Sequence, residues 1–351
     1  MLALLTGLWA GLARLGWDVP LPRPGFSSLH GPLMVSGFLG TLISLERAVA
    51  LGRPWAYATP LLTGLGGVSL IVGAPLIAAQ WLILAGSLGL VAIFAAIIRR
   101  HPALYTFTMG GGSLVWALGN LLWCLGWPVF LVVFWWAAFL VVTIAGERLE
   151  LARLQQVTGA AQATFLLLLG ILLTGLLLLG WSFDGGVRLF GLGLAGLALW
   201  LGRHAIARRT VRQAGLTRFI AICLLTGYVW LGISGLSAIW FGGVPVGPQY
   251  DATLHAFFLG FVFAMIFAHA PIIFLAVLGA RMTYRPLFYA HVVLLQVTLV
   301  VRLIGDAAGW SAGRQVGGLL NAVTLLLFLV NTVSALQSPP ERAGTAQGRG
   351  A

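Results

Sequence analysis

The chain contains no lysine, only two cysteines and only eight acidic residues among its 351. Charged residues make up 8% of the sequence and hydrophobic residues 60%. A soluble domain of this length could not bury so much apolar surface, so the composition indicates a polytopic helical membrane protein. Cys124 and Cys223 each stand alone in an apolar segment, which excludes a disulfide framework and a thiolate metal site.

Several signatures of catalysis and of nucleic-acid binding are also missing. The sequence has no phosphate-binding glycine loop, no pair of carboxylates in one pocket, no nucleophile beside a base and no nucleic-acid-binding module. These absences argue against an ATP-driven pump, a membrane hydrolase and a nucleic-acid partner. The net charge of +12 comes from twenty arginines, and we interpret it as a signal of membrane topology.

Apolar runs bounded by glycine, proline and arginine predict an all-α fold of about twelve membrane spans, each near the roughly twenty residues that a bilayer core requires. The runs cover residues 1–17, 27–50, 56–75, 77–99, 103–126, 128–147, 160–181, 186–202, 217–241, 252–279, 286–305 and 314–336. Residues 1–338 are expected to form one transmembrane domain, and residues 339–351 a disordered cytoplasmic tail.

The arginines gather in alternate connections between these spans. Those after the second, fourth, sixth, eighth and tenth spans hold most of them, including Arg47, Arg99, Arg148, Arg208 and Arg285. The positive-inside rule therefore places these connections and both termini in the cytoplasm of a multi-pass protein of the bacterial inner membrane, in contact with the lipid bilayer.

Spans two, six and ten share sequence features. His30 precedes Glu46 by sixteen residues, Leu131 precedes Glu147 by the same number, and span ten begins at His255. This pattern predicts three pseudo-repeated four-helix units, with span six lacking its histidine. The units cover approximately residues 1–100, 101–206 and 215–338.

Two histidines begin apolar spans in the same way, in Ser28-Leu29-His30 and Thr253-Leu254-His255. An ionisable side chain at bilayer depth is costly and therefore marks a functional site. Imidazole nitrogens from two helices commonly hold haem iron, so we expect His30 and His255 to be the axial ligands of a b-type haem. The alternative is that each histidine makes a hydrogen bond between helices.

Arg302 lies near the end of span eleven, at the depth of the two histidines, where a guanidinium needs an anionic partner. Haem propionates would supply one through bidentate contacts. The alternative is an ion pair with Asp306, one helical turn away. Asp251, four residues before His255, either orients that imidazole or, as we expect, caps the start of span ten.

A second group of polar residues lies deeper in the predicted bundle. His269 follows His255 by fourteen residues, about 21 Å along a helix, so one metal cannot take both. With Met265 one turn before it, and Glu46 and Glu147 at a similar depth, His269 suggests a second site for a metal, copper being one candidate, or for a proton path. The alternative is that the two glutamates are interfacial charges.

The stretch Thr226-Gly227-Tyr228-Val229-Trp230-Leu231-Gly232 with Leu254-His255-Ala256, and also Leu29-His30-Gly31, resembles the NnrS family. That resemblance implies a twelve-span bacterial inner-membrane protein associated with haem, copper and nitric oxide stress. The architecture also resembles subunit I of the haem-copper oxidases, whose low-spin haem takes histidines from spans two and ten. Spans six and seven have no histidine here, so an oxygen-reducing binuclear centre is not expected.

Together these features predict a haem-binding protein for electron transfer or for handling nitric oxide or redox stress. Its redox partner would be a quinol or a cytochrome. If it is an enzyme, we expect a haem-dependent oxidoreductase and not a proton-pumping oxygen reductase. The alternatives are a cofactor-free permease for a small solute, whose polar residues line a path across the membrane, and a haem or metal chaperone.

Overall fold

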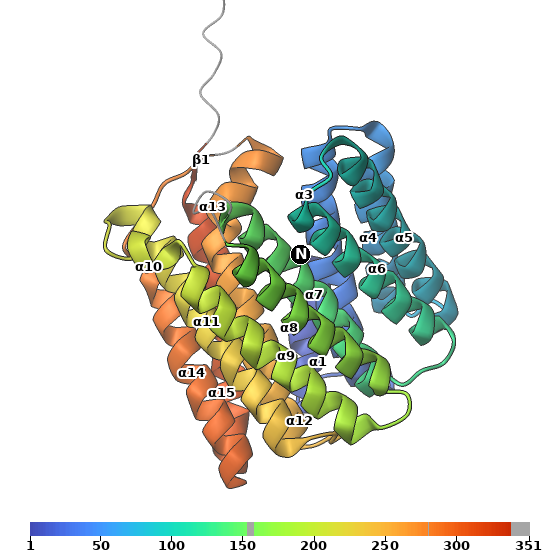
Figure 1. The fold of residues 1–351 in the computed structure, drawn as a ribbon. Coiled ribbons are helices and arrows are strands. Elements are labelled where there is room, and N and C mark those ends of the chain that lie inside the picture. Colours follow the sequence, from blue (N-terminus) through green and yellow to red (C-terminus); the bar gives the residue numbers. More distant parts are fainter. Residues whose placement is uncertain (153–157, 280, 338–351) are drawn as a thin grey trace, which may run out of the picture.

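The computed structural model describes residues 1–152, 158–279 and 281–337, and in these ranges the protein is almost entirely α-helical (Figure 1). Most helices are continuous rods separated by short connections. These are α1 (Leu2–Arg14), α4 (Ala58–Val72), α5 (Leu76–Arg100), α6 (Leu104–Cys124), α7 (Val129–Ala152), α8 (Gly159–Leu178), α9 (Phe183–His204), α11 (Gly215–Phe241), α14 (Phe288–Ala308) and α15 (Ser311–Ser334). Short elements in the connections are the helices η3 (Pro54–Tyr57) and α10 (Ala207–Thr210) and the strands β1 (Arg281–Met282) and β2 (Leu336–Gln337), which pair antiparallel.

Two further rods change their helical type along their length. The first, here called the His30 rod, runs through η1 (Phe26–Leu29), α2 (His30–Pro32), the π-helix η2 (Leu33–Gly40) and α3 (Thr41–Leu51). The second, the His255 rod, runs through α12 (Pro248–His255), the π-helix η5 (Ala256–Phe263) and α13 (Ala264–Leu278). Both π segments have eight residues and follow closely after a predicted ligand; π-helices are rare and are frequently found at functional sites.

The predicted spans match these rods closely. Within the described ranges, ten helical stretches are long and apolar enough to cross a membrane, which confirms an all-α membrane protein. The break expected near Gly73 is present, since α4 ends there in a left-handed glycine with φ +84°. The 13-residue α1 is about 20 Å long, short of a bilayer core, and the 21-residue α6 is not among the ten. Twelve spans and three repeat units therefore stay predictions, and the predicted tail, 339–351, lies outside the described residues.

The rods form one bundle with a buried centre. In the most apolar 18-residue stretch of α7, 83% of the residues are buried. The corresponding share is 72% in the His255 rod and only 28% in α8. A helix that buries most of its circumference belongs to the interior, and one that exposes apolar side chains all round is suited to lipid contact. The His255 rod packs against α11 and against the His30 rod, so both predicted ligands come from elements near the centre.

The connections divide the molecule into two ends. One, here called the histidine end, holds His30, His255 and the connection from α11 to α12. The other, the arginine end, holds α10 and β1, which lie together at the top of Figure 1. The arginine-rich connection from α9 to α11, which includes Arg208, lies at this second end, as the alternation in the sequence requires.

Candidate functional site

His30 and His255 meet at the histidine end. Their ring centroids are 6.1 Å apart and their planes are inclined by 24°. Eight residues further along each rod, Phe38 and Phe263 form a second pair, with centroids 6.4 Å apart and planes inclined by 18°. The two rods therefore run side by side in the same direction and present equivalent residues to each other.

The short helix α1 positions the His30 ring. His30 Nδ1 lies 2.8 Å from the carbonyl oxygen of Gly7. A carbonyl can only accept a hydrogen bond, so Nδ1 carries the proton and Nε2 of the neutral ring keeps a free lone pair. Gly11 lies against the same ring, because a Cβ placed there would be 2.8 Å from His30 Nδ1. Two glycines one turn apart thus let α1 approach closely enough to hold this imidazole.

His255 is held by a carboxylate as well as by a carbonyl. Its Nδ1 lies 2.9 Å from the backbone oxygen of Asp251 and 3.2 Å from Asp251 Oδ1. Arg302 in turn donates to both oxygens of Asp251, from Nε at 3.0 Å and from Nη2 at 2.8 and 3.1 Å. A histidine whose Nδ1–H is bound by a supported carboxylate is typical of metal ligands, since the carboxylate orients the ring and raises its basicity.

Two expectations about these residues need correction. Asp251 does not cap the His255 rod, because α12 begins at Pro248 and Gly247 occupies the cap position without a side-chain hydrogen bond. The other interpretation, that Asp251 orients His255, is the one confirmed. Arg302 is hydrogen-bonded to Asp251, whereas the ion-pair partner of Asp306 is Arg314, with Nε 3.0 Å from Oδ1. The contact between Arg302 and a haem propionate stays a prediction.

The two imidazoles are only partly covered by other side chains. His30, Met34 and Phe38 lie one turn apart on one face of their rod, and each keeps part of its surface open. Leu33, by contrast, is completely buried. His255 also keeps 17% of its side-chain surface. Both imidazoles therefore keep a small part of their surface open.

At the arginine end, the predicted inner residues gather in a network of ion pairs. Arg47 Nη2 binds Glu46 Oε1 at 2.7 Å and Glu147 Oε1 at 2.8 Å, so it links α3 to α7. Arg148 Nη2 contacts His269 Nε2 and lies 3.9 Å from Glu147 Oε2. This network joins the His30 rod, α7 and the His255 rod at equivalent depths.

The network does not have the form of a metal centre. His269 Nδ1 lies 2.5 Å from the carbonyl oxygen of Met265, and its Nε2 faces the Arg148 guanidinium, so neither ring nitrogen is free. In the part of the chain that the structure describes, no group of three or more His, Cys, Asp or Glu side chains is arranged to hold a metal ion. The grouping of Glu46, Glu147 and His269 is confirmed, but a second metal finds no support in its geometry.

Gly7 and Gly11 were not assigned to the site from the sequence, and for Asp251 the orientation of His255 was the less favoured of two interpretations. Gly7 and Gly11 carry a signal in their four-residue spacing, which places two small residues on one face of a helix. Asp251 carries one in its four-residue distance from His255, which puts both side chains on one helical face.

Comparison with known proteins gives one match. A family model described as "Domain of unknown function (DUF8744)" covers residues 1–337. Neither a curated protein nor a solved structure matches the chain.

Proposed function

The chain belongs to the DUF8744 family, whose function is unknown, and we propose that it binds a b-type haem between His30 and His255. One observation carries the proposal: two imidazoles from neighbouring rods lie with their ring centroids 6.1 Å apart, each with Nδ1 bound to the protein and Nε2 without a partner among the described residues. Two imidazoles this close, each with one nitrogen available, are suited to share one iron.

The separation of the rings fits one ion between them. The observed centroid separation of 6.1 Å would let both imidazoles bind one iron. Direct hydrogen bonding between the rings is disfavoured, because both Nδ1 protons are used elsewhere and both Nε2 atoms are acceptors.

The surrounding residues suit this role. Asp251 and Arg302 fix the orientation of His255, while Gly7 and Gly11 let α1 fix that of His30. A bound haem would supply one-electron redox chemistry and an iron that binds small ligands. Because Arg302 is already neutralised by Asp251, we assign it to positioning, and the exposed Arg14 at the end of α1 is better suited to meet a propionate.

We extend the proposal to the predicted architecture and setting. Each rod has a π segment of eight residues, and Phe38 and Phe263 pair as His30 and His255 do. These features support the interpretation that the two rods are equivalent elements of an internal repeat. Loop charge supports a histidine end on the outer face of a bacterial inner membrane. We also propose an NnrS-like role in electron transfer or in nitric oxide stress, which a haem held by His30 and His255 would serve.

An absorption spectrum of the detergent-purified protein tests the proposal. We expect a Soret band and reducible α and β bands, both lost in His30→Ala and in His255→Ala but kept in His101→Ala, which removes an exposed histidine from a connection. A colourless protein purified from haem-replete cells would overturn the proposal and favour the cofactor-free permease. Substoichiometric, exchangeable haem would instead indicate a chaperone.

A further inference from the structure

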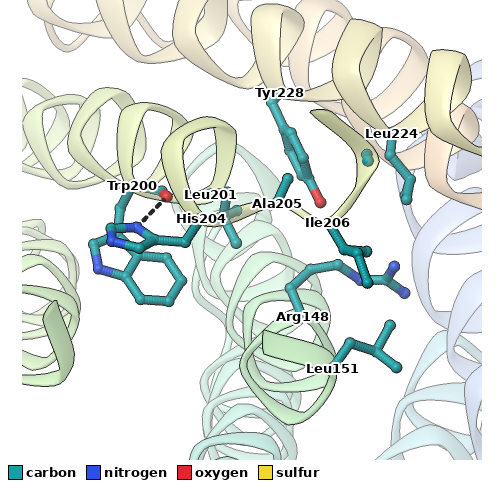
Figure 2. A pocket seen from close by; sticks show the side chains of 10 residues that line it. Arg148, Leu151, Trp200, Leu201, His204, Ala205, Ile206, Leu224 and Tyr228 are labelled. Carbon is teal, nitrogen blue, oxygen red and sulfur yellow. Dashed lines mark hydrogen bonds between the residues drawn. The ribbon is translucent and has the colours of Figure 1, made fainter. Parts of the chain in front are cut away.

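A cavity at the arginine end lies outside the proposed haem site. It is narrow and partly open, and is bounded by α7, α9, α11 and the connection before α10. Figure 2 shows Arg148 entering from one side and Tyr228 from the other, with Ile206 between them. None of its lining side chains, all within the described ranges, is acidic.

Arg148 is largely buried and shares its nearest counter-charge, Glu147, with Arg47. Its side chain is 11% exposed, and its hydrogen bond is to His269, whose Nε2 is a neutral acceptor. The carboxylate oxygen of Glu147 is 3.9 Å away, beyond hydrogen-bond length, and the other oxygen of Glu147 is bound by Arg47. Arg148 Nε is buried and has no partner among the described residues. An anion bound to this guanidinium would satisfy its unpartnered N–H and add to the distant charge of Glu147.

The rest of the lining favours an anion with an apolar part. The Tyr228 hydroxyl points into the cavity as a donor, while Leu224 and Ile206 supply an apolar wall (Figure 2). The carbonyl of Trp200, in the last turns of α9, would repel an anion, but it is bound by His204 Nδ1 at 2.9 Å. Three arginines of the adjoining connection and one at the near end of each flanking helix add positive potential, namely Arg203, Arg208, Arg209, Arg212 and Arg218.

We propose that this cavity binds a phosphate group through Arg148 and Tyr228, supplied by an anionic lipid headgroup or by free phosphate. The planar fork of a guanidinium matches two phosphate oxygens, and a hydroxyl donates to a third. The arginine end is where a cytoplasmic leaflet would present its anionic headgroups. This site is independent of haem binding at the other end of the bundle.

Thermal unfolding of the delipidated protein in detergent, at constant ionic strength, tests the proposal. The additions are phosphatidylglycerol, phosphatidylcholine and inorganic phosphate. A ligand that binds only the folded protein raises its melting temperature with concentration. We expect phosphatidylglycerol to raise it and phosphatidylcholine not to. A lipid site leaves inorganic phosphate without effect, and a free-phosphate site responds to both anions.

Two variants connect the effect to the cavity. Tyr228→Phe keeps every contact of Arg148 and removes one donor to a charged group, so we expect the apparent affinity to fall on the order of tenfold. Arg148→Gln should abolish the response, and the control Arg99→Gln, at an exposed arginine of the same end, should not change it. If Arg148→Gln does not fold, the response of Tyr228→Phe alone tests the proposal. The proposal is overturned if no anion stabilises the wild type, or if Tyr228→Phe responds as the wild type does.

Discussion

Asp251 is the residue on which the histidine end depends most. Its carboxylate accepts from His255 on the same helix and from Arg302 on α14, and both of these side chains are largely buried. Removing one member of such a buried pair leaves a charge without compensation in a medium of low dielectric, which costs more than the pair itself contributes.

We therefore expect Asp251→Asn and Arg302→Gln each to lower the free energy of unfolding by about 3–5 kcal/mol. The double variant should lose much less than the sum of the two, because it leaves no unpaired charge. Chemical unfolding in detergent measures all three. The control pair is Asp184 and Arg188, an exposed i,i+4 ion pair, for which Asp184→Asn and Arg188→Gln should show no measurable coupling. If the losses of unfolding free energy in the two single variants add up to the loss in the double variant, Asp251 and Arg302 do not act as a pair.

The sequence predicts the two proposed ligands, but it does not identify the residues that hold their rings in place. His30 and His255 stand out because each is a costly polar residue at the start of an apolar run. The partner of Arg302 is a contact between rods, which spacing along one chain segment cannot identify. Asp251 was assigned to a cap because an aspartate near the start of a helix is typical of that role, and the helix in fact begins three residues earlier, at Pro248.

At the scale of the element, α1 determines how His30 is held. Gly11 faces the His30 ring, so a methyl group at this position would force the ring or the helix to move. We expect Gly11→Ala to cost about 1–3 kcal/mol of stability and to change the Soret band of a haem-loaded protein. Gly111→Ala is the matched control, because a Cβ there meets nothing within 4 Å. It should be neutral or stabilise by up to about 1 kcal/mol. Equal melting temperatures for the two variants would contradict this role of α1.

The π segments are the elements that the sequence does not reveal. Leu33–Gly40 and Ala256–Phe263 are apolar nearly throughout, so their hydrophobic pattern has no period from which a helical type could be read. Their side chains do not advance by the 100° per residue of an α-helix. The predicted difference in depth between His255 and His269 nevertheless holds, since His255 lies at the histidine end and His269 in the network at the arginine end.

At the scale of the whole molecule, the two ends differ in charge, which predicts their sides of the membrane. Cys124→Ser removes the partly exposed cysteine and leaves Cys223, which is fully buried. In this background, Val246→Cys adds an exposed thiol at the histidine end. Arg208→Cys adds an exposed thiol at the arginine end. A membrane-impermeant thiol reagent should label Val246→Cys in spheroplasts and Arg208→Cys only after permeabilisation. The reverse pattern would invert the topology and place the phosphate site outside.

Much of the architecture follows from composition alone. Glycine, proline and arginine mark the connections, so the predicted ends of most rods agree with the observed ones within a few residues. Which rods become neighbours depends on packing between side chains far apart in the chain. The sequence pattern thus predicts that spans two and ten are equivalent, but not that α1 covers the first of them.

The contacts around the two histidines join the beginning of the chain to its end. His30 is bound by Gly7, and Gln315 Nε2, on α15, donates to the carbonyl oxygen of Leu15 just beyond α1. A ribosome delivers the N-terminal helices to the membrane first, so His30 is inserted long before His255 has been synthesised. The pair can assemble only after the His255 rod has entered the bilayer. A cofactor held by both histidines must therefore be loaded after that rod has been inserted.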